Sequence, residues 1–508
     1  MTEAYTLIGL LVSQVSFARS YGGPDTESVR GIVQTTDGGF IVAGETKSFG
    51  AGSYDFMAMR LLSTGDPFWV KTLGGTGDDR AFSVALAIDG GCVIVGETKS
   101  YGVGDYDVLV MKLGPAGGFR WAKTYGGLLR ERGTCIKPTS DTGYILAGWT
   151  VSSGQGSADL LVMKMDSAGN RVWTRTFGGD TSDYAHQVIQ TQDGGFLVAG
   201  TSRSFGAGDF DFLVLKLNSS GTLSWARAIG GPGIEDARIL SQTTDNGYIV
   251  GGWTNSFGSG DYDVLLVKLN SSGGFQWAKT YGGASLDWGT SGILLPDGGF
   301  LVVGVTLTYD PEGDLFLLRL DPAGNPDWLK VLKEEGDGVS GATTVIQTGD
   351  GGFAVGGWKG DSWDFLVIKT DQDGNYDEDS NCMKPDILTS LTIMPNLETL
   401  TLGASWVPLV SNPNPSQNTP SLTMTNVTCE PVYEEVGESL VEPNDIVCYP
   451  IPRAIAFISS CAAEISIYSS DGCVAYSGTL EKGKNMIPID RGIYFWQAGA
   501  YKGKAVVR

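Results

Sequence analysis

The chain has 508 residues, which is enough for two or three domains with sizeable hydrophobic cores. Its formal net charge is -22, with 57 acidic against 35 basic residues, and such a surface repels nucleic acid and anionic membranes. No run of about 20 apolar residues occurs, so the sequence predicts no membrane-spanning helix. Nucleic-acid-binding and membrane-spanning proteins are therefore excluded as functional classes.

The N-terminus and the cysteines bear on the compartment. Residues 5-YTLIGLLV-12 form a short apolar run, so residues 1–16 are predicted to be a signal or leader segment. The seven cysteines form no Cys-x-x-Cys pair, which argues against a zinc ribbon or a thioredoxin-like site. Five of them follow residue 380, which favours a secreted C-terminal part over a reduced cytosolic enzyme. We predict no metal and no cofactor.

An internal repeat dominates residues 17–381. The stretch 204-SFGAGDFD-211 has close copies that begin at residues 48, 100, 152 and 256, so the five copies, with that at 204, follow one another at a step of 52 residues. Gly-Gly pairs and Asp-Gly-Gly-Phe-like turns keep this step, and the turns show seven copies. Self-similarity at a fixed period of this length is typical of propellers and related arrays.

Turn residues divide each repeat into four strand-like runs, here named a to d. In the fourth copy these runs are 186–191, 196–201, 211–217 and 223–229. Asp-Gly-Gly joins strand a to strand b as a tight hairpin, and glycine-rich loops make the other connections. Four antiparallel strands in a repeat of this length indicate a propeller blade.

The first and last strands of the repeat predict how the ring closes. Strand d first occurs as 17-FARSY-21, before any strand a, and its last copy is missing after residue 371. We expect the N-terminal strand to complete the seventh blade, whose other strands lie within 343–370, and so to remove open sheet edges. The predicted fold is all-β, a seven-bladed β-propeller of 52-residue blades plus a small C-terminal β-sandwich.

The period is lost after the propeller. Residues 382–437 are rich in Pro, Ser, Thr and Asn and are predicted to be a linker. Residues 438–508 contain the alternating runs 463-AEISIYSSDGCVAYSG-478 and 492-GIYFWQAGAYKGKAVVR-508 with an Asp-Gly turn. This pattern predicts the small antiparallel sandwich.

Two resemblances follow from these residues. The segments ISIYSSDGCVAYSG, GIYFWQ and GKAVVR resemble the sorting domain of type IX secretion cargo, over about the last 60 to 70 residues. The blades are similar to bacterial SBBP-type propeller repeats. The resemblance implies export across the outer membrane by the type IX secretion machinery, with residues 438–508 as the sorting signal. It also implies a secreted or cell-surface location, and no fixed activity.

One position varies between blades on an otherwise repeated scaffold. It follows the glycine that ends strand b, and it leads toward the face that carries the d-to-a and b-to-c loops. We predict an asymmetric ligand site here, in which indole faces stack on sugars or apolar groups. The competing interpretation, which the repeated scaffold favours, is that large side chains at this position fill gaps between blades. The predicted ligand-binding residues are Glu45, Glu97, Trp149, Trp253 and Trp358.

Acidic residues repeat with the blades as well. One series begins strand c and another occupies the d-to-a turns, and both are expected to hold turns and blades together. The alternative for the second series is a ring of carboxylates that binds a cation. The first series is Asp55, Asp107, Asp159, Asp211, Asp263, Asp314 and Asp364, and the second is Glu27, Asp79, Glu131, Asp183, Glu235 and Asp287.

Nucleophilic catalysis is hard to build from this sequence. The only histidine is His186, which is expected to be a solvated strand residue, and no Gly-x-Ser-x-Gly elbow occurs. We therefore predict no catalytic residues and a non-enzymatic binding or adhesion module, with a glycan or a surface protein as its ligand. The alternative is a polysaccharide hydrolase or lyase, because glycoside chemistry needs only two carboxylates at a suitable separation.

Overall fold

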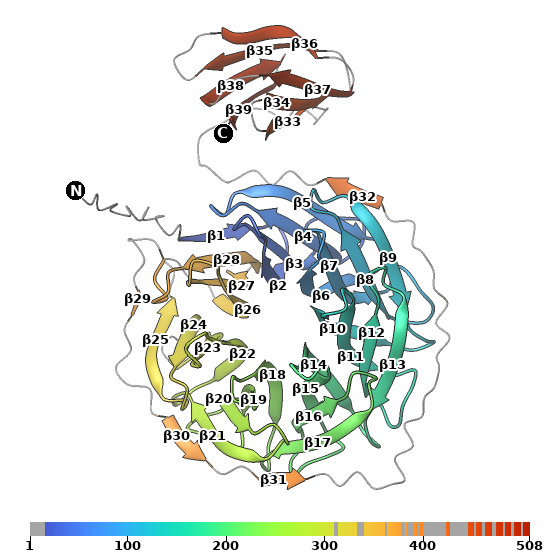
Figure 1. Ribbon diagram of the computed structural model, residues 1–508, viewed down its shortest axis with the longest axis vertical. Helices are drawn as coiled ribbons and strands as arrows, with labels where there is room; N and C mark the ends of the chain where they lie inside the picture. Colours follow the sequence, from blue (N-terminus) through green and yellow to red (C-terminus); the bar gives the residue numbers. More distant parts are fainter. Residues whose placement is uncertain are drawn as a thin grey trace, which may run out of the picture. The chain divides into compact units, whose positions relative to one another are not determined.

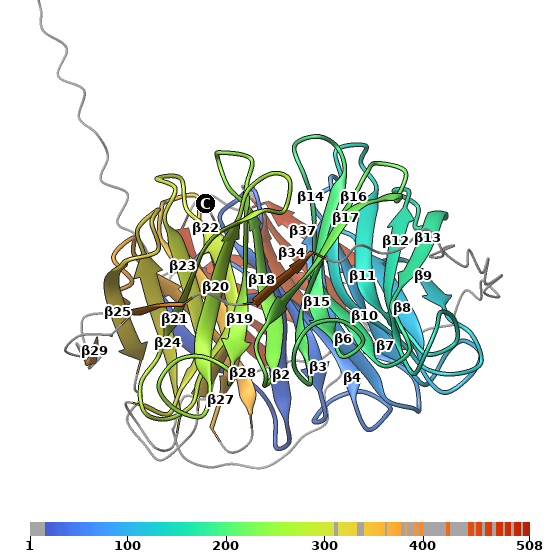
Figure 2. The same ribbon diagram turned by 90° about the horizontal axis from the view of Figure 1, so that it is seen from below.

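The computed structural model describes residues 16–308, 313–332, 340–360 and 363–376 in full, and after them only the backbones of strands β29 to β39. The chain divides into two units, Met1–Pro431 and Val432–Arg508. In the first unit, seven antiparallel sheets form a ring with their innermost strands around its centre (Figure 1). Seen from the side, the strands run along the axis of the ring (Figure 2). The unit is a seven-bladed propeller.

Blades 1 to 3 each take strands a to d in chain order from the centre outward. Blade 1 is β2 (Glu27–Gln34), β3 (Phe40–Thr46), β4 (Asp55–Leu61) and β5 (Pro67–Gly74). Blade 2 is β6 (Asp79–Leu86), β7 (Cys92–Thr98), β8 (Asp107–Leu113) and β9 (Phe119–Tyr125). Blade 3 is β10 (Glu131–Pro138), β11 (Tyr144–Thr150), β12 (Asp159–Met165) and β13 (Arg171–Phe177).

Blades 4 to 6 follow the same order. Blade 4 is β14 (Asp183–Gln190), β15 (Phe196–Ser202), β16 (Asp211–Leu217) and β17 (Leu223–Gly230). Blade 5 is β18 (Glu235–Gln242), β19 (Tyr248–Thr254), β20 (Asp263–Leu269) and β21 (Phe275–Tyr281). Blade 6 is β22 (Asp287–Leu294), β23 (Phe300–Thr306), β24 (Asp314–Leu320) and β25 (Pro326–Leu332).

Blade 7 confirms the predicted closure. Its strands a to c are β26 (Ser340–Gln347), β27 (Phe353–Lys359) and β28 (Asp364–Thr370), and its outer strand is β1 (Phe17–Tyr21). Strand β1 pairs antiparallel with β28.

The contacts of β1 repeat those of the other outer strands. A side chain added to Gly65 would meet the ring of Phe17, just as one added to Gly117 would meet the ring of Trp69. Phe17 therefore takes the place that tryptophan holds in the d strands of the other blades.

Strand a begins earlier than predicted. In blade 4 it starts at Asp183 and not at residue 186, and in blade 7 it starts at Ser340 and not at 343. In blade 4 the cause is the acid at the first position, because the Asp183 carboxylate accepts hydrogen bonds from the Gly179 backbone N–H and the Ser202 hydroxyl. These bonds hold the d-to-a turn and extend the pairing with strand b.

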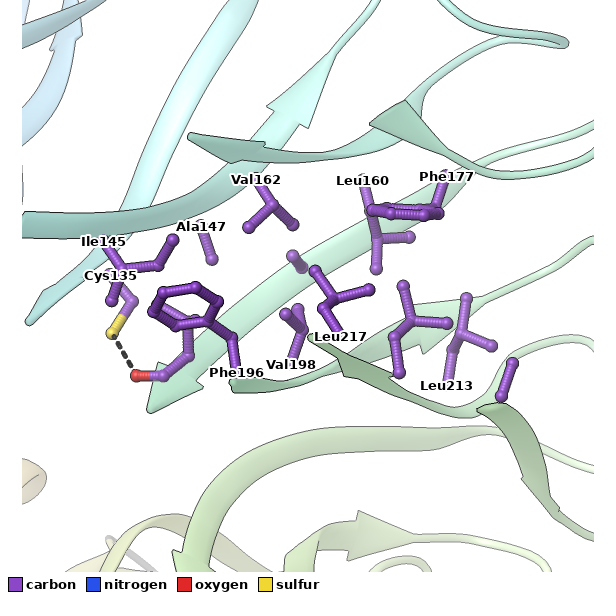
Figure 3. Close-up of a cluster of buried hydrophobic side chains, with 14 residues drawn as sticks. Cys135, Ile145, Ala147, Leu160, Val162, Phe177, Phe196, Val198, Leu213 and Leu217 are labelled. Atoms are coloured by element: carbon purple, nitrogen blue, oxygen red, sulfur yellow. Dashed lines mark hydrogen bonds between the residues drawn. The ribbon is translucent and has the colours of Figure 1, made fainter. Parts of the chain in front are cut away.

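The hydrophobic core lies between neighbouring blades. One cluster joins Cys135 and Ile145 of blade 3 to Phe196, Val198 and Leu213 of blade 4 (Figure 3). Strands b and c are buried on both faces, which is why they read as continuous apolar runs rather than as alternating patterns. Burying one such side chain stabilises the fold by about 1.5–3 kcal/mol.

The Asp-Gly-Gly turns have a second function, which the sequence pattern did not indicate. In every blade the turn aspartate forms an ion pair with a Lys or Arg of strand c. The cation is nearly buried in several blades, so the pair ties the a-to-b hairpin to the third strand. The pairs are Asp37–Arg60, Asp89–Lys112, Asp141–Lys164, Asp193–Lys216, Asp245–Lys268, Asp297–Arg319 and Asp350–Lys369.

Four short strands follow the propeller and pair with its outer strands. They lie within the predicted linker 382–437, which is therefore not wholly irregular. They are β29 (Cys382–Met383) on β25, β30 (Ser390–Ile393) on β21, β31 (Asn396–Thr399) on β17, and β32 (Thr423–Asn426) on β5.

The second unit contains a three-stranded and a four-stranded antiparallel sheet. The side chains of this unit, and so the predicted packing of its sheets as a sandwich, lie outside the described residues. The predicted leader over 1–16 also lies outside them, apart from Ser16. Across the part of the chain that the structure describes, we find no helix with the length and apolarity needed to cross a membrane. The strands are β33 (Ile446–Ile451), β34 (Ala454–Ser459), β35 (Ala463–Ser469), β36 (Val474–Leu480), β37 (Gly483–Pro488), β38 (Gly492–Ala498) and β39 (Tyr501–Val507).

Candidate ligand site at the inner rim

The variable position lies inside strand b and not after it. Glu97 is the last residue but one of β7 and pairs across the sheet with Arg80 of β6. The glycine before it does not end the strand. A side chain on Gly96 would lie 1.8 Å from the Arg80 carbonyl oxygen, so glycine is needed where strands a and b approach closely. In every blade the start of strand a pairs with the end of strand b, as Arg80 does with Glu97. We call these paired strand ends the inner rim.

In blades 1 to 5 the variable side chain contacts a residue of the next blade, 35 positions further along the chain. The partners match in character, because charge meets charge, aromatic ring meets aromatic ring, and hydroxyl meets carboxylate. Filling the space between blades is therefore one function of this position. The pairs are Glu45 with Arg80, Glu97 with Arg132, Trp149 with Tyr184, Thr201 with Asp236, and Trp253 with Trp288.

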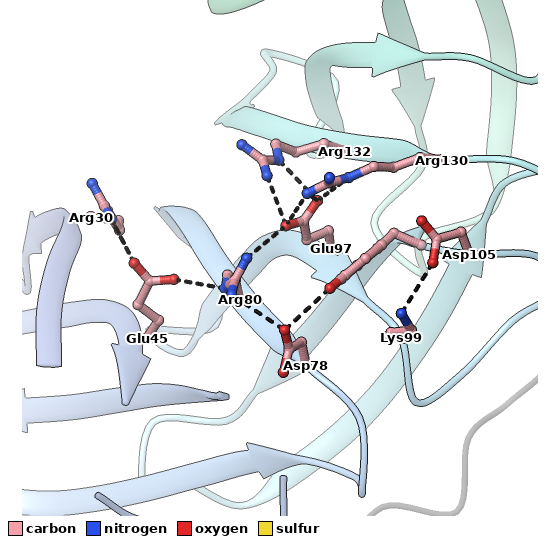
Figure 4. A network of polar contacts seen from close by, with 10 residues as sticks. Arg30, Glu45, Asp78, Arg80, Glu97, Lys99, Asp105, Arg130 and Arg132 are labelled. Carbon is pink, nitrogen blue, oxygen red and sulfur yellow. Dashed lines mark hydrogen bonds and ion pairs between the residues drawn. The ribbon is translucent and has the colours of Figure 1, made fainter. Parts of the chain in front are cut away.

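Blades 1 to 3 carry a charged part of the rim (Figure 4). The Glu97 side chain is 0% exposed, and its carboxylate lies 2.8 Å from Arg132 Nη2 and 3.0 Å from Arg130 Nη2. Arg80 bridges both predicted glutamates, at 3.6 Å from Glu45 and 3.8 Å from Glu97. Arg30 completes the row at 2.7 Å from Glu45. We call Arg30, Arg80, Arg130 and Arg132 the arginine arc.

Aromatic rings fix the guanidinium planes of this arc. The guanidinium carbon of Arg80 lies 4.3 Å from the centre of the Tyr54 ring, and that of Arg130 lies 4.5 Å from the Tyr106 ring. Cation–π stacking of this kind leaves the edges of a guanidinium group for in-plane hydrogen bonds. The arc is thus ordered by buried carboxylates on one side and by rings on another.

Blades 3 to 6 carry an aromatic part of the rim, and we call Trp149, Tyr184, Trp253, Tyr262 and Trp288 the aromatic arc. Trp149 and Tyr184 meet edge to face with ring centres 5.6 Å apart, and Trp253 and Tyr262 do so at 5.0 Å. Trp288 lies 6.4 Å from Trp253 and is 36% exposed, so one large ring of the arc reaches solvent.

The predicted residues are only partly brought together. Glu45 and Glu97 join through Arg80, and Glu97 joins Trp149 through Arg132, whose guanidinium lies 5.4 Å from the Trp149 ring, so three of the five belong to one network of contacts. Trp253 belongs to the aromatic arc through Trp288. Trp358 stacks on Trp363 within blade 7, at 4.3 Å and 11°, and joins neither arc among the described contacts.

Sequence reasoning missed half of the rim. The partners on strand a (Arg80, Arg132, Tyr184, Trp288) vary from blade to blade just as their strand b counterparts do. The same comparison of blades, applied to the second residue of strand a, would have found them. The spacing of 35 residues would then have identified the pairs.

His186 is largely covered by its neighbours, so its prediction as a solvated residue is wrong. Its side chain is 12% exposed, because β14 is an innermost strand and its inward residues are covered by the neighbouring blades. Burial and the nearby Arg238 charge lower the pKa of His186 to about 3, while Asp236 opposes this. The imidazole is therefore neutral, with Nε2 3.3 Å from an Asp236 oxygen.

The acids of both repeated series are buried at the starts of strands c and a, except for Asp364, which is partly exposed. Glu27 accepts hydrogen bonds from the Thr46 hydroxyl at 2.7 Å and from the Gly23 backbone N–H at 2.9 Å. Asp107 accepts one from the Val103 backbone N–H at 2.8 Å. These contacts bear out the interpretation that the acids hold turns and blades together. No group of three or more acidic, histidine or cysteine side chains that could hold a metal ion occurs among the described residues.

A family model matches part of blade 6. Residues 295–327 match a family described as a domain of unknown function (DUF5122) beta-propeller. No match was found among the curated proteins.

Three solved structures illustrate the structural likeness. Sqt1 from Chaetomium thermophilum is 12% identical with a TM-score of 0.37, and the match covers 70% of this chain and 99% of that one. PorZ, a surface component of the type IX secretion system of Porphyromonas gingivalis, is 10% identical with a TM-score of 0.37, covering 93% and 59%. A puromycin hydrolase is 11% identical with a TM-score of 0.37, covering 81% and 58%. The chain is a β-propeller by its own sheet topology, and these distant matches assign it no activity.

Proposed function

We propose that the protein is a non-enzymatic binding module, secreted or displayed at the cell surface, that takes a glycan on the aromatic arc of the inner rim. One observation carries this proposal. Half-buried tryptophan and tyrosine rings gather at one level of the ring, and Trp288 is 36% exposed beside Trp253. Rings that are held in place and reach solvent can stack on sugar faces without a large loss of side-chain entropy on binding.

The state of the two rim glutamates favours binding over hydrolysis. A glycosidase needs one carboxylic acid that can give up a proton and a second carboxylate that can reach the sugar. Glu45 and Glu97 instead accept ion pairs from two and three arginines respectively, and Glu97 is fully buried. Both are therefore better suited to ordering arginines than to acid–base chemistry.

The double variant Trp253→Ala, Trp288→Ala is expected to weaken glycan binding at least about tenfold, because it removes two stacking surfaces. Glycan-array screening followed by calorimetry on the best ligand measures this. Phe68→Ala is the matched control, since Phe68 is 47% exposed on an outer strand, away from the rim. Unchanged affinity in the double variant would contradict the proposed site, and release of shortened sugars would favour the hydrolase or lyase alternative.

We also propose that residues 438–508 direct export through the type IX secretion machinery. The support is the resemblance of ISIYSSDGCVAYSG, GIYFWQ and GKAVVR to sorting domains of type IX cargo. A chain that ends at residue 437 is expected to accumulate in the periplasm of a type IX host, as fractionation and immunoblotting would detect. A chain ending at 437 that still reached the medium would disprove the sorting role.

A further inference from the structure

We infer that the ligand of the inner rim is an acidic saccharide, whose carboxylate or sulfate group binds the arginine arc. This inference rests on the proposed function and adds the charge of the ligand to it. It starts from the way in which the four guanidinium groups are occupied within the protein.

Three of the four arginines use only one edge of the guanidinium group. In Arg30, Arg130 and Arg132 the nitrogens Nε and Nη2 donate to Glu45 or Glu97. An arginine has five N–H donors in a rigid fork, so within the part of the chain that the structure describes Nη1 of each of these residues keeps two donors for a ligand. Arg80 differs, because all three of its nitrogens face protein carboxylates.

In the arginine arc the positive charges are partly exposed, whereas the negative charges that hold them are buried. The side chains of Arg30 and Arg130 are 33% and 35% exposed, whereas those of Glu45 and Glu97 are 9% and 0% exposed. Four guanidinium groups here face three carboxylates, those of Glu45, Glu97 and Asp78. Solvent therefore meets a cationic edge in a chain whose net charge is -22.

The arginine arc runs directly into the aromatic arc. The guanidinium groups of Arg130 and Arg132 lie 5.5 Å and 5.4 Å from the Trp149 ring, which meets Tyr184 of the next blade. A sugar ring stacked at this point would place a ring substituent within reach of the free Nη1 groups. Paired N–H donors match the two oxygens of a carboxylate or sulfate, and charge-assisted hydrogen bonds are the strong ones. Uronic acids and sulfated sugars carry both the ring and the anion.

Matched saccharide pairs test the inference. Oligogalacturonate, heparan sulfate and alginate oligosaccharides are compared with their carboxyl-reduced or desulfated forms by calorimetry and on arrays. We expect an acidic form to bind at least tenfold more tightly than its neutral form, with an affinity that falls as salt is raised. The carboxylate and sulfate arms show which anion is preferred. Equal binding of neutral forms would overturn the inference and leave the proposed function intact, whereas binding of no saccharide would overturn both.

Variants separate the anion contact from folding. Arg30→Gln keeps Glu45 paired with Arg80, so the fold should hold, and it is expected to lower the affinity for the acidic form about tenfold with little effect on the neutral form. The triple variant Glu97→Gln, Arg130→Gln, Arg132→Gln removes the two arginines of the arc that lie beside Trp149 without leaving a buried charge unpaired, and it should reduce the difference between the two forms. Arg203→Gln is the control, as an exposed arginine of a b-to-c loop. A folded triple variant that preferred the acidic form as strongly as the native protein does would overturn the inference.

Discussion

A chain that begins at Gly22, and so lacks β1, is expected to melt at a temperature lower by on the order of 10 °C and to associate. Strand β1 buries Phe17 and Tyr21, which are 6% and 8% exposed, and the Tyr21 hydroxyl donates to the Gly65 carbonyl oxygen at 2.5 Å. Removing it also leaves the β28 edge without a partner, and open edges pair with other chains. Differential scanning calorimetry and size-exclusion chromatography measure both effects.

Two point variants and a peptide sharpen this test. Phe17→Trp restores the residue that other blades carry at this place and should keep the melting temperature. Arg19→Ala removes only an exposed ion pair to Asp66, which is worth at most about 1 kcal/mol. A synthetic peptide of residues 16–23 should bind the shortened chain and recover part of its stability by strand addition. A shortened chain that stayed monomeric at the native melting temperature would show that β1 does not close the ring.

The fold could be predicted because the same pattern of strand and turn residues occurs seven times in the sequence. The 52-residue step, the turn glycines and the early 17-FARSY-21 copy all indicate a closed seven-bladed propeller. An ambiguous strand in one copy is resolved by comparing it with the same strand in the other copies. Strand ends were less accurate. The start of β14 at Asp183 depends on hydrogen bonds to Gly179 and Ser202, which a residue pattern does not display.

The candidate site could be predicted only in part. Comparing blades found the variable residues on strand b, but two facts needed the structure. One is the pairing of Glu97 with Arg132 across a blade boundary, which depends on the spacing between sheets. The other is burial, since Glu97 and His186 read as polar strand residues and lie inside the protein. The two interpretations of the variable position are therefore not exclusive, because the same side chains fit blades together and line the rim.

The repeated ion pairs stabilise the fold more as the pH rises, whereas the repeated buried acids stabilise it less as the pH rises. Hydrogen bonds and a cation hold the pKa of the turn residue Asp141 at about 2 against the opposing effect of burial. A group with a lowered folded pKa stabilises the protein above its unfolded pKa, and this contribution is lost as the pH falls toward 2. The loss of these turn ion pairs therefore lowers the stability of the fold at acidic pH.

The buried acids that begin strand c lower the stability of the fold at neutral and higher pH. Burial raises the pKa of Asp107 to about 7, the Val103 N–H lowers it, and the Glu131 charge raises it further. Burial likewise raises the pKa of Asp159 to about 7 and the pKa values of Asp55 and Asp263 to about 6. The unfolded chain releases these protons near pH 4, so the folded state holds more protons between about pH 4 and 7. Stability must fall as the pH rises through this window.

The melting temperature is therefore expected to be highest between about pH 4 and 6 and to be lower at pH 8 by on the order of 5 °C. Calorimetry across pH 3 to 9 measures this, and proton release on unfolding at pH 6 is an independent readout. A melting temperature that rose steadily from pH 5 to pH 8 would contradict the assignment of protonated carboxyl groups.

Asp107→Asn should identify the source of the effect. A side chain added to Gly126 would lie 1.7 Å from Asp107 Oδ1 and 2.6 Å from Glu131 Oε2, so both carboxylates crowd one glycine. An amide at position 107 keeps the acceptor for Val103 and removes the charge that opposes Glu131. The variant should melt at a higher temperature than the native protein at pH 8 and close to it at pH 5. Asp105→Asn is the control, because Asp105 lies just before β8 with its side chain 55% exposed, and the loss of an exposed ion pair should change the melting temperature little at either pH.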